Sequence, residues 1–166
     1  MIQASRSPKA GKIILGVIVL TLAGIIVYLP ALDSSFHFDD RPSIVNNLSL
    51  RSPSGWGKLW SFWPTRFLLY LTFSLDYYFW RLNPYGYHLG GLVLHILNAF
   101  LVWRLASALL SSRPAARAGT GAERTAFLTG LIFLLHPLQT QAATYIVQRA
   151  TVLAAFFYLI SLAAYL

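Results

Sequence analysis

The chain has 166 residues, of which 57% are hydrophobic and 11% are charged, and its mean hydropathy is +0.59. Soluble domains are typically about 45–50% apolar and about 25% charged, so this composition excludes a soluble fold and indicates a protein surrounded mostly by lipid. The net charge of +8 comes from basic residues beside apolar runs, which favours anionic lipid over nucleic acid as a partner, and the absence of cysteine excludes disulfides, thiolate metal sites and cysteine nucleophiles.

The N-terminal part of the chain predicts an uncleaved membrane anchor. Residues 1–12 are short and basic, which predicts a cytoplasmic N-terminus. Residues 13–32 carry no charge and match the length of about 20 residues that a helix needs to cross the hydrocarbon core. The sequence Tyr28-Leu29-Pro30-Ala31 lacks the small residues of a signal-peptidase site, so we expect the anchor to be retained.

Residues 33–81 are predicted to form an external loop that contains interfacial helices and an acidic pair. Turn-forming residues punctuate its first half, and several tryptophans indicate contact with a membrane surface. The second half is rich in aromatic residues but contains Arg66, Asp76 and Arg81. A charge at the bilayer centre costs at least about 2.5 kcal/mol, so we expect helices that lie in the interface rather than a further span.

Residues 82–103 form a second uncharged run and are predicted to be the second transmembrane helix. His88 and His95 lie about two turns apart on one face of that helix, where hydrogen bonding inside the bundle is the simplest role for both. Residues 104–120 are basic and predict a cytoplasmic loop. Two crossings return the chain to the side of its N-terminus, which agrees with that loop.

The remaining residues predict two further spans. Residues 121–136 are predicted to be a short third transmembrane helix that ends at His136-Pro137, and residues 137–149 form an external loop. Residues 150–166 begin a fourth transmembrane helix that the chain leaves incomplete, as expected for a fragment of a longer protein. The fold class predicted is therefore all-α: a polytopic membrane helical bundle with about four transmembrane helices.

Two adjacent carboxylates, Asp39 and Asp40, are the strongest candidates for chemistry. One carboxylate can act as a general base for a hydroxyl group while the other orients it or binds a cation. An interfacial arginine can bind phosphate through its planar set of donors. Structural roles remain as alternatives, because an acidic pair can solvate a loop, an arginine can extend to lipid headgroups and a histidine can cap a helix. No phosphate-binding loop, nucleophile elbow or zinc-binding His-Glu-x-x-His motif is present.

Four stretches resemble the GT-C membrane glycosyltransferases, in particular the O-mannosyltransferase-like proteins in which transmembrane helices precede tetratricopeptide repeats. Their order and spacing match that family from about residue 13 to residue 166. The sequence departs from the family at Gln141 and Thr151, where acidic residues are common, and the family has many more spans. The stretches are Phe38-Asp39-Asp40 with Ile44-Val45-Asn46-Asn47, Arg66 to Tyr77, Asn83-Pro84-Tyr85-Gly86-Tyr87-His88, and Phe133 to Ala142 followed by Arg149.

The resemblance implies transfer of a mannose-like sugar from a polyprenyl-phosphate donor to a protein or glycan hydroxyl, with inversion at the sugar carbon. It implies that Asp39 or Asp40 is the catalytic base. It further implies that Arg149, with Arg66 and His136, contacts the donor phosphate. No metal ligand is assigned, and a requirement for a divalent cation is left open.

Two other functions remain open on the sequence alone. The first is a non-catalytic membrane scaffold or assembly protein, or a degenerate fragment of an enzyme. The second is a segment of a transporter, with His88 and His95 lining a polar path. The short loops and the absence of cysteine favour a bacterial inner membrane over the endoplasmic reticulum.

Overall fold

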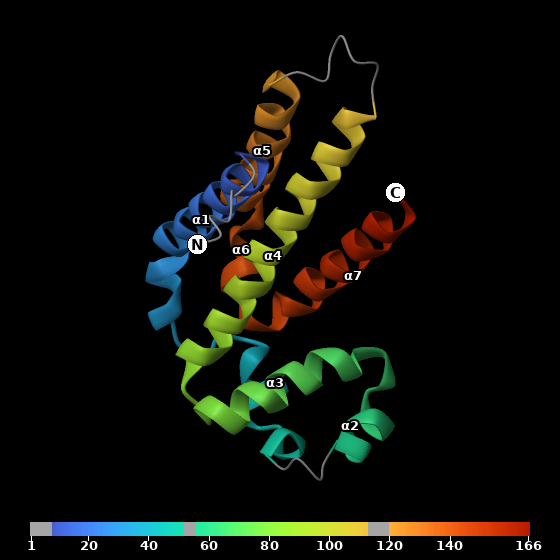
Figure 1. Cartoon of the computed structure of the whole chain (residues 1–166). Helices are drawn as coiled ribbons and strands as arrows, with labels where there is room; N and C mark the ends of the chain where they lie inside the picture. The colour runs from blue at the N-terminus through green and yellow to red at the C-terminus, as the bar shows by residue number, and fades with distance from the viewer. Residues whose placement is uncertain (1–7, 52–55, 113–119) are drawn as a thin grey trace, which may run out of the picture.

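A computed structural model describes residues 8–51, 56–112 and 120–166, and every regular element among these residues is helical (Figure 1). The prediction of an all-α membrane bundle is confirmed. Among these described residues, three helices are long and apolar enough to cross a membrane. They are Ala10–Asp33 with 24 residues, Pro84–Ser111 with 28 residues and Ile146–Tyr165 with 20 residues, and their most apolar 18-residue stretches have mean hydropathies of 2.7, 1.7 and 1.7.

Helix α4 (Pro84–Ser111) is the centre of the bundle, and it packs against α1 (Pro8–Tyr28), α5 (Thr120–Leu135) and α7 (Arg149–Tyr165). Figure 1 shows α4 running the length of the bundle between α5 and α7. With 16 residues, α5 is shorter than the roughly 20 residues of a typical span. Its assignment as a third transmembrane helix therefore stays a prediction.

The predicted external loop contains two helices, α2 (Trp56–Phe62) and α3 (Phe67–Trp80), joined through a 3₁₀ turn at Pro64–Arg66. Figure 1 shows α3 lying across the ends of the long helices rather than alongside them. This orientation is the one expected of a helix in the membrane interface. Short helical segments complete the chain at Leu29–Asp33, Arg41–Val45, Leu48–Arg51, Pro137–Gln139, Thr140–Thr144 (α6) and Ile146–Gln148.

Helix α4 begins at Pro84, two residues after the start of the predicted second span at residue 82, and extends beyond its predicted end at residue 103. The side chain of Asn83 accepts a hydrogen bond from the backbone N–H of Tyr85 at 3.1 Å and caps the first turn. The helix continues to Ser111 because alanine and leucine, both strong helix formers, follow Arg104. Arg104 is therefore helical and exposed, and residues 113–119 of the predicted basic loop lie outside the described residues.

The C-terminal end of α5 is joined to two neighbouring helices through one carbonyl group. Pro137 turns the chain after Leu135, so the Leu134 carbonyl lies in the last turn, where intrahelical partners run out. It accepts hydrogen bonds from the Tyr28 hydroxyl at 2.9 Å and from Nε2 of His95 at 3.1 Å. The buried His95 ring therefore has the structural role within the bundle that was the simplest expectation for it.

Candidate functional site

The acidic pair lies in a tight turn between α1 and α3, and its two members face different surroundings. Phe38, just before the pair, has a backbone φ of 39° and an almost fully exposed side chain. This left-handed conformation is uncommon for a residue with a bulky side chain. It precedes an exposed Asp39 and a buried Asp40. The sequence placed these residues together but did not separate their roles.

Asp40 fastens the turn to the segment that precedes α7. One of its carboxylate oxygens accepts a hydrogen bond from the His37 backbone N–H, and the other accepts one from the Val147 N–H, both at 3.0 Å. Its side chain is 1% exposed. Burial raises the pKa of Asp40 above its usual value, and the two backbone N–H groups oppose that rise. Asp40 therefore holds the segment between α1 and α2 against the end of the bundle.

Asp39 differs from Asp40 because a hydrogen bond fixes its backbone but not its carboxylate. Its N–H donates a hydrogen bond to the Tyr145 hydroxyl at 3.0 Å, and its carboxylate accepts none from the described part of the chain. The carboxylate is therefore open to an incoming group, while the backbone beneath it is fixed by Tyr145 and by the neighbouring Asp40. This is the geometry that a positioned general base needs.

Arg149 is the first residue of α7, and it is buried at 2% exposure with several partners. It forms an ion pair with Asp76 of α3, donates to the Thr72 hydroxyl at 3.1 Å and donates to the Tyr87 carbonyl. Its guanidinium carbon also lies 4.9 Å from the centre of the Phe73 ring. Contact between Arg149 and a donor phosphate stays a prediction, and it would require the phosphate to compete with Asp76.

The Asp76–Arg149 pair was missed at the sequence level, although a signal for it exists. The chain has only five acidic residues, and Asp76 lies within an otherwise apolar stretch. Buried charges in such surroundings are almost always paired. An arginine that begins an apolar helix is a natural partner, but a separation of 73 positions hides the pairing from any local pattern.

Arg66 is exposed and lines an apolar groove of about 490 Å³ between the α2–α3 region and α7. Aromatic and aliphatic side chains form the walls of the groove, among them Trp60, Phe67, Leu153 and Phe157. Ala150, next to Arg149 in the chain, also lines the groove. An exposed guanidinium beside an apolar groove can bind the phosphate of a molecule that also has a hydrocarbon chain.

The rings of His88, His95 and His136 have backbone partners. The Nδ1 atom of His136 accepts a hydrogen bond from the Leu138 N–H at 3.2 Å, so this exposed ring caps the turn after α5. The Nε2 atom of His88 lies 3.1 Å from the Ser34 carbonyl, to which it donates as the Nε2–H tautomer. These bonds favour structural roles for His88 and His95 over a polar path. In the described part of the chain, no three His, Asp or Glu side chains are grouped as ligands for a cation.

Three apolar helices and an acidic pair at one end of an all-helical bundle define an integral membrane protein with a candidate polar site at that end. Known proteins of this kind match the sequence. The chain is 33% identical over 162 residues to mouse protein O-mannosyl-transferase TMTC2, an alignment that covers 90% of this chain and 18% of the mouse protein. It is 30% identical over 165 residues to human protein O-mannosyl-transferase TMTC4, covering 89% of this chain and 22% of the human protein.

A Drosophila protein O-mannosyl-transferase, Tmtc3, is 30% identical in an alignment of 186 positions. That alignment covers 98% of this chain and 20% of the Drosophila protein. The resemblance to the O-mannosyltransferase-like family is therefore confirmed over nearly the whole chain. The chain spans about a fifth of the length of these relatives, between 18% and 22%. Neither a protein-family profile nor a solved structure matches it.

Proposed function

We propose that the chain is the N-terminal part of a GT-C type membrane glycosyltransferase. It would move a mannose-like sugar from a polyprenyl-phosphate donor to a hydroxyl group of a protein or glycan on the external face of the membrane. The similarity to proteins named as O-mannosyl-transferases supports this reaction class. The observation that carries the proposal is the division within the acidic pair, in which Asp40 is buried and bonded while Asp39 is exposed on a fixed backbone.

In the proposed reaction, the Asp39 carboxylate accepts the proton of the acceptor hydroxyl as that oxygen bonds to the anomeric carbon of the sugar. The bond from the anomeric carbon to the phosphate oxygen breaks, and the polyprenyl phosphate leaves with the electron pair. Attack from the face opposite the leaving group inverts the sugar carbon. A base that removes a proton in the transition state contributes about 10²–10⁴-fold to such a rate.

The groove beside Arg66 supports a place for the donor. Its apolar walls suit a polyprenyl chain, and the guanidinium of Arg66 suits the phosphate that gains charge as the sugar leaves. Both the groove and the acidic turn adjoin the start of α7, because Asp40 is bonded to Val147 and Ala150 lines the groove. Arg149 lies between them in sequence, and we place it as a second contact for the phosphate once Asp76 is displaced.

We place the N-terminus in the cytoplasm and the acidic pair on the external side of a bacterial inner membrane. The basic residues before residue 13 and after residue 103 support this orientation by the positive-inside rule. The curated relatives come from animals. The bacterial assignment rests on the lack of cysteine and on the short loops.

The proposal is tested by transfer of radiolabelled mannose from a polyprenyl-phosphate donor to acceptor peptides, with the full-length protein in proteoliposomes. Replacement of Arg66 by glutamine should raise KM for the donor by about tenfold or more, because a hydrogen bond to a charged group contributes about 1.5–3 kcal/mol. Arg104→Gln is the matched control, since Arg104 is also exposed but lies near the opposite end of α4. A wild-type protein that inserts and folds but transfers no label would overturn the proposal and favour the scaffold.

A further inference from the structure

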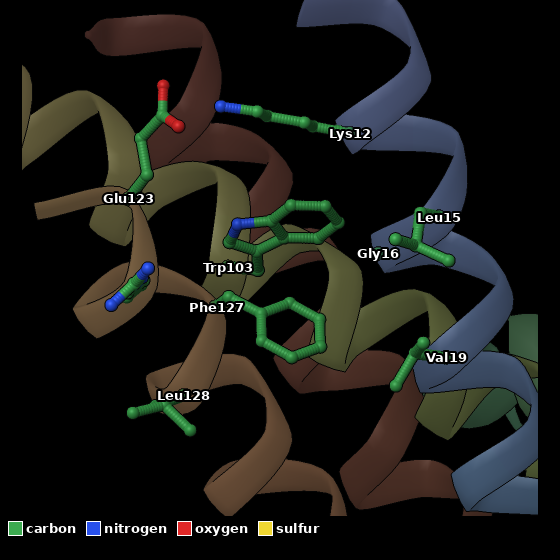
Figure 2. Close-up of a pocket in the computed structure, with 9 residues that line it drawn as sticks. Lys12, Leu15, Gly16, Val19, Trp103, Glu123, Phe127 and Leu128 are labelled. Atoms are coloured by element: carbon green, nitrogen blue, oxygen red, sulfur yellow. The ribbon is translucent and has the colours of Figure 1, made fainter. Parts of the chain in front are cut away.

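A second hollow, separate from the acidic pair, lies at the other end of the bundle between α1, α4 and α5 (Figure 2). Its volume is about 520 Å³. Leu15 and Val19 of α1 and Phe127 and Leu128 of α5 form its apolar walls. The proposed glycosyl transfer uses none of these residues, so a role for this hollow does not depend on that reaction.

Trp103 forms the floor of this hollow, and a glycine makes room for it. A Cβ atom added at Gly16 would lie 2.3 Å from Cη2 of the Trp103 ring, so α1 approaches the indole only because residue 16 has no side chain. The Phe127 ring meets the indole edge-on, with ring centres 5.4 Å apart. The indole N–H donates no hydrogen bond to a described residue and so remains available to a ligand.

Three charged side chains stand at the rim. Lys12 comes from the first turns of α1, and Glu123 and Arg124 come from the first turns of α5. Figure 2 shows the Lys12 ammonium and the Glu123 carboxylate extending toward each other above the indole ring. Within the described ranges the ion pair of the protein is Arg149–Asp76, so the rim charges are not paired with one another.

The arrangement of charge over an apolar hollow matches one class of membrane lipid. Two cations can hold a phosphate, and the carboxylate of Glu123 can accept hydrogen bonds from a primary ammonium group. The apolar walls below suit acyl chains, and a tryptophan near the end of a membrane helix is typical of headgroup depth. A purely anionic headgroup offers no ammonium group to the Glu123 carboxylate, and a quaternary ammonium has no N–H to donate.

We propose that this hollow binds a phospholipid with a phosphoethanolamine headgroup. Lys12 and Arg124 bind the phosphate, Glu123 binds the ammonium group, and the acyl chains lie against Leu15 and Leu128. The bound lipid thereby fills the space between α1 and α5 that the protein itself leaves open. The end of the bundle opposite the acidic pair therefore prefers lipids with a phosphoethanolamine headgroup.

Native mass spectrometry of the full-length protein, released from nanodiscs of defined lipid, measures the number of lipids retained. Phosphatidylethanolamine should be retained about tenfold more strongly than phosphatidylglycerol or phosphatidylcholine, the change expected from one charge-assisted hydrogen bond. Leu128→Trp fills the hollow and should abolish this retention. Ile132→Trp is the matched control, because Ile132 is likewise exposed one turn further along α5 and does not line the hollow.

The variant Glu123→Gln distinguishes recognition of the headgroup from retention of lipid in the hollow. It should remove the preference for phosphatidylethanolamine over phosphatidylglycerol while retention of some lipid persists. Equal retention of all three lipids by the wild type, or a preference for phosphatidylglycerol, would overturn the proposed headgroup. Equal retention of phosphatidylethanolamine by Leu128→Trp and Ile132→Trp would overturn the proposed site. Failure of the wild type to retain any of the three lipids would overturn it as well.

Discussion

At one end of the bundle, charges and hydrogen bonds join segments that lie far apart in the sequence, whereas at the other end glycine and tryptophan fit helices together by shape. At the first end, Asp40 is bonded to Val147 and Arg149 is paired with Asp76. At the second end, Trp103 packs against Gly16 and Gly130, where added Cβ atoms would come within 3.0 Å of it. The polar end has fixed side chains available for chemistry, and the shape-based end has a hollow available for lipid.

The largest effect is expected from breaking the polar end at its buried ion pair. Replacing Arg149 by methionine leaves the half-buried Asp76 carboxylate without its partner, at a cost that approaches the roughly 3–5 kcal/mol of breaking a fully buried pair. The free energy of unfolding in mixed detergent micelles, titrated with sodium dodecyl sulfate, measures this loss. The double variant with Asp76→Leu should recover much of the loss, because no unpaired charge then remains.

The matched control for this pair is Arg66→Met, which removes an exposed arginine from the same end. It should change the free energy of unfolding by no more than about 0.5 kcal/mol. If Arg149→Met and Arg66→Met lose the same stability, the buried pair does not hold the polar end together.

A smaller effect is expected from breaking the shape-based end at Gly16. The methyl group of Gly16→Ala would overlap the Trp103 ring, so α1 must move away from α4, at a cost of about 1–3 kcal/mol. Gly11→Ala is the control on the same helix, since an added Cβ there meets no atom within 4 Å. The same unfolding titration compares the two variants. Equal stability of both would show that the close approach of α1 to the indole does not stabilise the bundle.

The smallest effect concerns the pH dependence of the Asp40 contact. Burial raises the pKa of Asp40 above its value of 3.8 in model compounds, so the folded state binds the proton more tightly than the unfolded state. The unfolding free energy of the wild type relative to Asp40→Asn should therefore be highest below pH 3.8 and fall as the pH rises through the raised pKa. The fall amounts to about 1.4 kcal/mol for each unit by which the pKa is raised. A difference that increases with pH would contradict the direction of this shift.

Composition and long apolar runs were enough to predict the helical membrane bundle, because a span needs about 20 apolar residues whatever its neighbours are. The pattern also indicated the helices across the end of the bundle, since Arg66, Asp76 and Arg81 do not suit a span. The sequence pattern did not predict contacts between residues that lie far apart in the chain. Asp76 meets Arg149 across 73 positions, and only the folded chain brings them together.

The candidate site was predicted as a set of residues but not as an arrangement. Neighbouring residues of the same type, such as Asp39 and Asp40, are equivalent in a sequence. Their difference comes from the left-handed turn at Phe38 and from the distant N–H of Val147. His136 illustrates the converse, because a histidine before Pro137 was open to a capping role and the structure shows that contact.

The most direct test of Asp39 as the catalytic base is the transfer rate of Asp39→Asn, measured beside its free energy of unfolding. Transfer from the polyprenyl-phosphate donor should fall about 100-fold or more while stability changes by no more than about 0.5 kcal/mol, because Asp39 is exposed and its carboxylate holds no other described part of the protein. Asp33→Asn, an exposed acid in the same segment, should transfer at the wild-type rate. Transfer by Asp39→Asn at the wild-type rate would contradict the assignment of Asp39 as the base.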